Sequence, residues 1–340
     1  MSSKLGAPNS ELVGVLLMSF GTAATLDDVP AYLASVRGGK PAPDDLVAEF
    51  KRRFALVGGS PLTRITTEQA AALEAHLNEG PGARGQGPGT ESGTSALPDP
   101  RPPTPDPRFV VRVGMRHAPP FIADGLRELA GAGASRVVAV ILSPQYSHVI
   151  MGGYLRAVDA ARQAMGGDLD VRVAGAWHDV DELLAGLTAK LRSALDRLEP
   201  AERASVPVLF TAHSLPRSVA DGEPRYIEQL RTTASAVADR AALSPGQWTF
   251  AYQSAGHTRE EWLTPDFKDL LPSLRANGHR TVLVAPVQFL ADHLEVLYDI
   301  DVAAREEAEA LGMQLVRTEM LNCDPALITA LATVVHRETG

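Results

Sequence analysis

The chain has 340 residues, of which 45% are hydrophobic and 21% are charged, a composition typical of a folded globular protein. Its formal net charge of −9 argues against a nucleic acid as a partner. Cys323 is the single cysteine, which excludes an internal disulfide and an iron–sulfur cluster held by four cysteines of this chain. Because the sequence lacks a run of about 18 apolar residues and an N-terminal signal segment, we expect a cytoplasmic protein without stable membrane insertion.

Apolar runs that alternate with helix-period segments indicate an α/β fold. Eight runs predict strands buried on both faces, at residues 13–20, 109–113, 137–142, 171–174, 206–211, 249–252, 281–287 and 314–316. Helical patterns cover residues 26–37, 44–56, 65–77, 119–132, 180–198, 225–242, 293–311 and 325–337. This order predicts two doubly wound Rossmann-like domains, each with a four-stranded parallel sheet, around a central cleft.

The expected domains are residues 10–177 and 178–322, followed by a C-terminal helical segment, 323–340. Residues 80–107 interrupt the first domain, and half of them are glycine or proline. Such a segment buries too little apolar surface to offset its ordering entropy, which predicts a disordered surface loop.

Histidines follow the predicted strands more often than a random distribution along the chain would give. Ligands of open α/β sheets bind beyond the carboxyl ends of the strands. Four of the nine histidines lie just after a strand, at His117, His148, His213 and His293. We therefore expect the functional site in the cleft at this edge of the sheets.

A pair of carboxylates follows the seventh predicted strand. Glu295 and Asp299 are four residues apart, which places them on one face of a helix. The residues around Glu295 are apolar, so we expect its carboxylate to enter an enclosed space and to need a cation there. An imidazole that faces a carboxylate across a cleft suits a divalent ion such as Fe(II) and also accepts protons. The residues thus predict a cleft enzyme with a His/Glu centre.

Several long strings resemble one family. They are TAHSLP (211–216), YQSAGHTREEWLTPD (252–266) and PVQFLADHLEVLYDID (286–301), supported by FGTAATLDDVPAYLASVRGGKPAP (20–43), GGSPLTRIT (58–66) and GMRHAPPFI (114–122). The chain resembles the ferrochelatase family, and most closely its bacterial coproporphyrin III members of Gram-positive type. Only residues 80–107 and the first dozen residues lie outside the resemblance.

The resemblance implies both a reaction and a site. Two chelatase-type domains would enclose a porphyrin, with the C-terminal helix packed back on the first domain, and Fe(II) would replace two pyrrole protons. His213 and Glu295 would be catalytic and contact the metal, with Asp299 as a further metal residue. The family's porphyrin-binding positions correspond here to Phe20, Arg37, Arg53, Phe54, Ser60, His117 and Tyr154.

The resemblance favours coproporphyrin III as the substrate in haem biosynthesis. It implies no cofactor beyond the substrate Fe(II), and it allows transient contacts with other enzymes of that pathway. Two alternatives stay open at this point. One is a ferrochelatase that acts on protoporphyrin IX, and the other is a carrier of porphyrin or haem without catalysis.

Two positions depart from the family pattern. Phe20 stands where Gram-positive members often have a tyrosine that faces the metal, so an axial ligand from this position is ruled out. Ala303 stands where some members continue the acidic row with a glutamate. We therefore expect a shortened metal path, or one that is rerouted through Asp301.

Overall fold

The computed structural model describes residues 11–79, 108–256 and 259–340. The disordered loop that the sequence predicts at residues 80–107 lies outside these described residues.

The first half of the chain forms a four-stranded parallel sheet in the order β2-β1-β3-β4. Its strands are β1 (Leu12–Ser19), β2 (Arg108–Met115), β3 (Arg136–Ile141) and β4 (Asp170–Val173). Strand β1 is central and almost entirely buried, because its apolar side chains project toward helices on both faces. The expected strands are confirmed, with ends that shift by a few residues.

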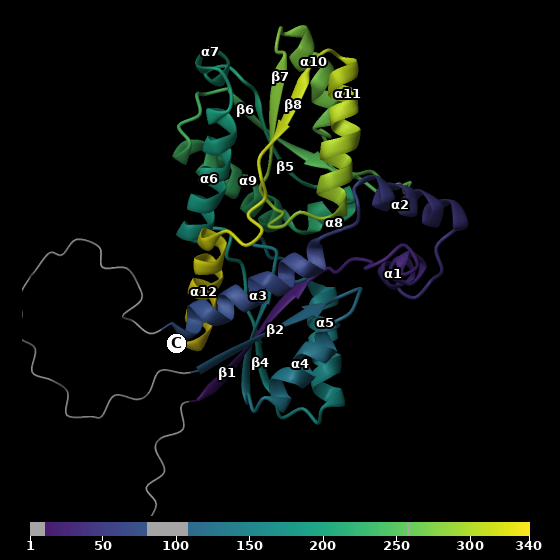
Figure 1. Ribbon diagram of the computed structural model, residues 1–340, viewed down its shortest axis with the longest axis vertical. Coiled ribbons are helices and arrows are strands. Elements are labelled where there is room, and N and C mark those ends of the chain that lie inside the picture. Colours follow the sequence, from purple (N-terminus) through teal and green to yellow (C-terminus); the bar gives the residue numbers. More distant parts are fainter. Residues whose placement is uncertain (1–10, 80–107, 257–258) are drawn as a thin grey trace, which may run out of the picture.

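The second half repeats this arrangement in the order β6-β5-β7-β8. Its parallel strands are β5 (Val208–His213), β6 (Trp248–Gln253), β7 (Thr281–Pro286) and β8 (Gln314–Arg317). Figure 1 shows this sheet in the upper half of the molecule and the first sheet in the lower half. The predicted α/β class with two parallel sheets is confirmed.

Helices cover both faces of each sheet. Three successive helices separate β1 from β2, as expected: α1 (Val29–Val36), α2 (Asp44–Leu56) and α3 (Leu62–Asn78). The others are α4 (Ile122–Gly131), α5 (Gly152–Ala164), α6 (Asp181–Asp196), α7 (Pro200–Arg203), α8 (Arg217–Gly222), α9 (Pro224–Arg240), α10 (Leu271–Ala276), α11 (Arg305–Ala310) and α12 (Pro325–Thr339), with the 3₁₀ turn η1 (Lys268–Leu270). Helices α1 and α2 stand beside the junction between the two sheets (Figure 1).

The helix expected at residues 293–311 differs from the prediction. Its first part is a π-helix, η2 (Val296–Ala304), which continues into α11. A π-helix is rare and often marks a functional site. Apolar periodicity does not separate a π-helix from an α-helix over so few turns, because both bury one face, here at Val296, Ile300 and Ala304.

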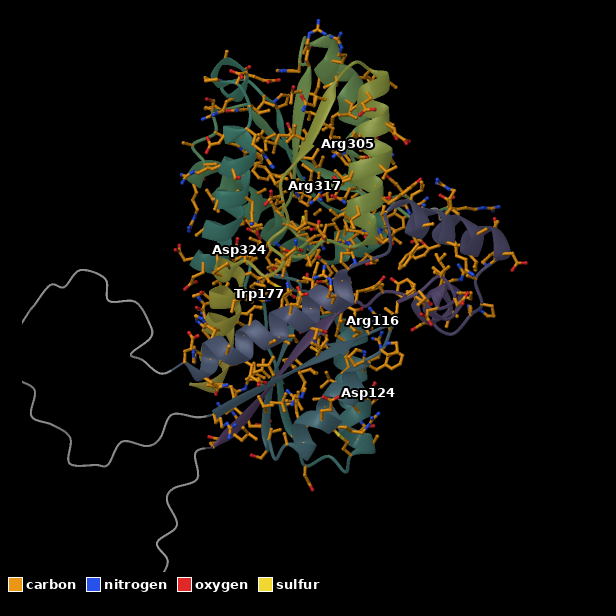
Figure 2. All side chains as sticks on the ribbon, viewed as in Figure 1. Arg116, Asp124, Trp177, Arg305, Arg317 and Asp324 are labelled. Atoms are coloured by element: carbon orange, nitrogen blue, oxygen red, sulfur yellow. The ribbon has the colours of Figure 1, made fainter. Side chains whose placement is uncertain are left out.

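The two halves share one hydrophobic core. Helix α12 packs on α6, α3 and β3, so the end of the chain returns to the first sheet. Trp177 is 2% exposed between the halves, and its indole N–H donates to the carbonyl of Ile141 at 3.3 Å (Figure 2). Ser147 also donates across to Glu223 of the second half at 2.8 Å. The exact domain boundaries at 177 and 322 stay predictions.

No helix within the described residues combines the length and the apolar character needed to cross a bilayer.

Glycine at position 125 allows α4 to pack closely on the first sheet. A Cβ atom there would lie 2.5 Å from Leu16 Cδ1 and 2.6 Å from the carbonyl oxygen of Val113. Because this carbonyl belongs to β2, it cannot move without disturbing the strand. We expect Gly125→Ala to lower the free energy of unfolding by about 1–3 kcal/mol, measured by urea denaturation.

The matched control is Gly131→Ala in the same helix. A Cβ atom at Gly131 meets nothing within 4 Å. This variant should change the free energy of unfolding by less than about 1 kcal/mol. Equal effects of the two substitutions would contradict the close-packing explanation.

Candidate active site

A cleft of about 850 Å³ opens between the two sheets. Residues that end or follow six strands line it: Ser19 and Phe20 at the end of β1, Arg116 after β2, Leu142 and Ser143 after β3, His213 at the end of β5, Ser254 after β6 and Gln288 after β7. Both sheets therefore direct the carboxyl ends of their strands toward the same space, as expected for open α/β sheets. The volume lies within the usual range for small-molecule sites.

The imidazole of His213 is held in one orientation. Its backbone N–H donates to Gln288 Oε1 at 2.7 Å, and Gln288 Nε2 donates to the Tyr226 hydroxyl at 2.7 Å. His213 Nδ1 lies within hydrogen-bond distance of the Ser214 carbonyl oxygen. A carbonyl only accepts, so Nδ1 must carry the proton of the neutral ring. The lone pair of neutral His213 is therefore on Nε2, which faces the cleft.

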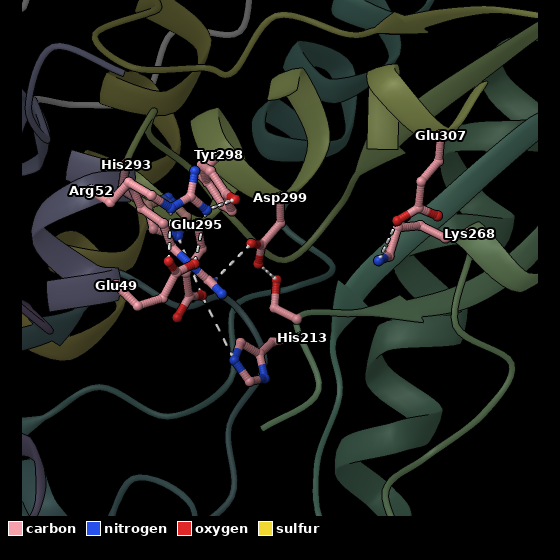
Figure 3. A network of polar contacts seen from close by, with 11 residues as sticks. Glu49, Arg52, His213, Lys268, His293, Glu295, Tyr298, Asp299 and Glu307 are labelled. Atoms are coloured by element: carbon pink, nitrogen blue, oxygen red, sulfur yellow. Dashed lines mark hydrogen bonds and ion pairs between the residues drawn. The ribbon is translucent and has the colours of Figure 1, made fainter. Parts of the chain in front are cut away.

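Glu295 lies between two imidazoles (Figure 3). Its Oε2 atom is 3.7 Å from His213 Nε2 and 3.7 Å from His293 Nε2. His293 Nδ1 donates to the carbonyl of Ala291 at 3.0 Å, so the same argument places the lone pair of a neutral His293 on Nε2. The structure thus brings together the expected pair, and it adds His293, to which the sequence assigned no role.

The carboxylate of Glu295 is ionised at neutral pH. Burial alone raises its pKa. The positive charge of His213 when its ring is protonated, a hydrogen bond and charge from protonated His293, and the charge of Arg53 outweigh this effect and hold the pKa at about 2. The expected enclosed space is only partly right, because the side chain faces the open cleft and is 45% exposed.

The spacing of these donors suits a small cation or a proton. Metal–ligand bonds of about 2.1 Å on either side of a divalent ion span up to about 4.2 Å, so a gap of 3.7 Å admits such an ion. Glu295 contacts His213 and His293 in two pairwise contacts. In the described ranges, no three His, Cys, Asp or Glu side chains form a ready group for a metal ion.

Asp299 lies one turn beyond Glu295 and also lines the cleft. Ser254 donates its hydroxyl to Asp299 Oδ2, and Arg53 Nη1 lies 3.7 Å from Asp299 Oδ1. Burial and the nearby charge of Glu295 raise the pKa of Asp299, although Ser254 and Arg53 oppose the shift. Asp299 therefore gives up a proton less readily than Glu295 does.

Arg53 is already engaged in this structure. Its Nε atom is 2.8 Å from Glu49 Oε1, and its guanidinium lies 4.7 Å from the centre of the Tyr298 ring. The contacts of Arg53 with Tyr298 and Asp299 connect α2 to η2 across the cleft.

The other predicted ligand-binding residues fall into two groups. Phe20, Ser60 and Tyr154 line the cleft, as Arg53 does. The remaining three, Arg37, Phe54 and His117, are not among the residues that line it. Phe54 is 4% exposed in an apolar cluster with Leu33 and Leu294, and Arg37 is exposed after the end of α1.

A sequence profile described as ferrochelatase matches residues 90–339, which is most of the chain. The chain belongs to the ferrochelatase family. The expected resemblance is thus confirmed, and membership makes this protein a metal chelatase, an enzyme of the lyase class.

Curated relatives match over nearly their full length. A ferrochelatase of Deinococcus radiodurans is 34% identical over 98% of this chain and 98% of its own. The coproporphyrin III ferrochelatase of Geobacillus thermodenitrificans is 34% identical over 95% of each chain. The coproporphyrin III ferrochelatase of Bacillus subtilis is 30% identical over 96% of this chain and 98% of its own.

Solved structures support the fold. SirB from Bacillus subtilis with Fe3+ superposes with a TM-score of 0.54 at 10% identity, covering 96% of this chain and 94% of SirB. DR2241 from Deinococcus radiodurans, described as structurally similar to chelatases, gives a TM-score of 0.51 at 14% identity, covering 96% of this chain and 54% of DR2241.

The metal path that the sequence allows through Asp301 stays a prediction, and in this ferrochelatase-family chain Asp301 is engaged in an ion pair. Arg317 at the end of β8 holds Asp301 with two parallel contacts, Nε to Oδ1 at 2.9 Å and Nη2 to Oδ2 at 2.8 Å. The same Nη2 atom lies 3.1 Å from Asp292 Oδ1. Asp301 is therefore committed to a fork-shaped ion pair that stabilises both ends of the segment carrying Glu295.

We expect Arg317→Met to lower the free energy of unfolding by about 2–3 kcal/mol, because it leaves two part-buried carboxylates without their cation. Arg305→Met is the matched control. Arg305 lies 3.7 Å from the same Asp301 but is 48% exposed, so its loss should cost less than about 0.5 kcal/mol. Urea denaturation of both variants measures the difference, and similar costs would contradict a special role for Arg317.

His117 is buried in this ferrochelatase-family chain. Its ring centre lies 4.5 Å from that of Phe20, and Nδ1 lies 3.0 Å from the Ser35 hydroxyl. Burial, assisted by the charge of Arg116, lowers the pKa of His117 from 6.5 to about 4. The folded state therefore prefers the neutral ring.

The lowered pKa of His117 makes the folded state less stable at acidic pH. Between pH 6.5 and 4 the unfolded chain binds a proton at His117 that the folded chain excludes, so stability falls as the pH falls. We expect His117 to contribute on the order of 2 kcal/mol to this loss between pH 7 and 4. Urea denaturation of His117→Phe should show a weaker pH dependence, and an unchanged dependence would contradict the burial argument.

Proposed function

We propose that the chain inserts Fe(II) into coproporphyrin III and releases two protons, with His213 and Glu295 as catalytic residues. The observation that carries this proposal is the 3.7 Å approach of His213 Nε2 to the ionised Glu295 carboxylate inside the cleft. Two electron-pair donors that face each other in this way attract either a cation or a proton. Iron insertion needs both functions at one place.

The proton balance assigns the roles. When Fe(II) enters the ring, two N–H bonds break, Fe(II) binds all four ring nitrogens, and two protons leave one after the other. The lone pair of neutral His213 Nε2 accepts a pyrrole proton, and the negative charge of Glu295 stabilises the resulting imidazolium. Asp299, whose pKa is raised, is suited to accept the proton next. When protonated, His293 attracts Glu295 from its other side.

The cleft walls suit a flat ligand with an acidic edge. Phe20 is 39% exposed on one wall and offers an apolar ring surface. The buried Ser60 hydroxyl oxygen has no hydrogen-bond partner in the described part of the chain, so a polar group of the ligand would satisfy it. Arg53 would exchange Asp299 for a propionate, and Tyr154 would contribute to the wall.

Coproporphyrin III is proposed because some close relatives carry this substrate in their names. Other relatives of equal similarity are named only as ferrochelatases. The absence of a further cofactor, the cytoplasmic location and transient contacts with other haem-pathway enzymes stay predictions. Arg37, Phe54 and His117 would act behind or beside the cleft wall rather than on it.

We expect His213→Ala to abolish iron insertion while porphyrin affinity changes by less than about tenfold. The substitution removes the proton acceptor and leaves the apolar walls intact. Glu295→Gln keeps the shape and removes the charge, so it should also reduce insertion by at least about a hundredfold. Anaerobic insertion assays and porphyrin fluorescence titrations measure the two quantities separately. Turnover at the unaltered rate in His213→Ala would overturn the assignment.

The substrate is tested by an anaerobic absorbance assay with Fe(II) and either coproporphyrin III or protoporphyrin IX. We expect rapid conversion of coproporphyrin III and slow conversion of protoporphyrin IX. Equal or reversed rates would overturn the choice of substrate but not the reaction. Tight binding of both porphyrins without insertion would indicate a carrier instead.

A further inference from the structure

Arg116 reaches the cleft from the end of the first sheet. It directly follows β2, and its backbone N–H donates to the carbonyl of Ser19 at 2.9 Å. The next N–H, of His117, donates to the carbonyl of Phe20 at 3.0 Å. These two bonds extend the pairing of β1 and β2 beyond the strands and fix the backbone at Arg116, whose side chain lines the cleft.

Among residues 11–79, 108–256 and 259–340, the charge of Arg116 has no counter-ion. The other guanidinium and ammonium groups that line the cleft are paired, Arg53 with Glu49 and Asp299, and Lys268 with Glu307 at 3.0 Å. In the described part of the chain, the Arg116 side chain forms no ion pair and donates no hydrogen bond. Its guanidinium instead lies 5.6 Å from the centre of the Tyr154 ring.

The helix turn that contacts Arg116 supplies no acidic group. The guanidinium lies against the first turn of α5, where a Cβ atom on Gly153 would be 2.0 Å from Arg116 Cζ. Only glycine leaves room for the side chain at this point. The first turn of α5 contains no acidic residue. The protein thus accommodates a cation at the cleft wall and leaves its hydrogen-bonding capacity unused.

We propose that Arg116 binds a carboxylate of the tetrapyrrole substrate. This inference rests on the proposed function and adds a substrate contact to it. A half-buried guanidinium gains most from a planar anion that accepts two parallel hydrogen bonds, and a propionate at the edge of a porphyrin is such an anion. Arg53 must first leave Asp299 to bind a propionate, whereas Arg116 is free to do so in this structure.

The test compares porphyrins that share a ring and differ in charge. Fluorescence titration without metal measures the Kd of coproporphyrin III and of its tetramethyl ester, which has no carboxylate. We expect Arg116→Met to raise the Kd for coproporphyrin III about tenfold, the usual order for a charge-assisted contact. The Kd for the ester should change less than about twofold. Arg116→Lys should restore part of the affinity.

The control variant is Arg127→Met, which removes one positive charge at an exposed position of α4 whose partner is Asp124. It should leave both Kd values unchanged and so exclude an effect of net charge. Equal losses for acid and ester in Arg116→Met would indicate a packing role beside Tyr154 and overturn the inference, as would no loss for either.

Binding is measured without iron, so the inference is tested apart from the reaction. If the unaltered protein binds coproporphyrin III but inserts no iron, the proposed catalysis is refuted. The role of Arg116 is then still tested by comparing how Arg116→Met changes the Kd of coproporphyrin III and of its ester. An unaltered protein that binds neither porphyrin overturns both proposals.

Discussion

The site depends on one hydrogen bond, from His213 Nδ1 to the carbonyl of Ser214. Because that bond fixes the proton on Nδ1, a neutral ring must present its lone pair at Nε2, toward Glu295. When His213 is neutral, two electron-pair donors, His213 Nε2 and Glu295 Oε2, lie 3.7 Å apart without a proton between them. This arrangement is unfavourable unless a cation or a proton occupies the gap, and this requirement makes the pair reactive.

The surrounding structure holds both members of this pair in place. Gln288 after β7 binds the backbone of His213 at the end of β5, so neighbouring strands fix the imidazole. On the other side, Arg317 from β8 holds Asp292 and Asp301, which flank Glu295 in the sequence. Two separate networks therefore fix the distance between His213 and Glu295. Gln288 holds the His213 side, and Arg317 holds the segment that carries Glu295.

The fold and the edge that holds the site could be predicted from the sequence, because buried parallel strands are continuous apolar runs and because ligands gather at their carboxyl ends. The choice of His213, among four strand-end histidines, as the partner of Glu295 came from the resemblance to ferrochelatases. His293 was expected at this edge, but its contact with Glu295, two positions away, was missed because it depends on how the segment before η2 turns. The ion pair of Asp301 could not be predicted because a lone acidic residue gives no sign of its partner, and Arg317 is sixteen positions away. The half-buried position of Arg116 without an ion pair among the described residues likewise follows only from the packing of α5 against the end of β2.

The most direct test of the central claim is anomalous diffraction from crystals of the unaltered protein soaked in Zn²⁺, a stand-in for the substrate ion. The account predicts a metal peak between His213 and Glu295, at about 2.0–2.2 Å from Nε2 and from a carboxylate oxygen. A metal bound only elsewhere in the cleft, with the gap between these two side chains empty, would contradict it.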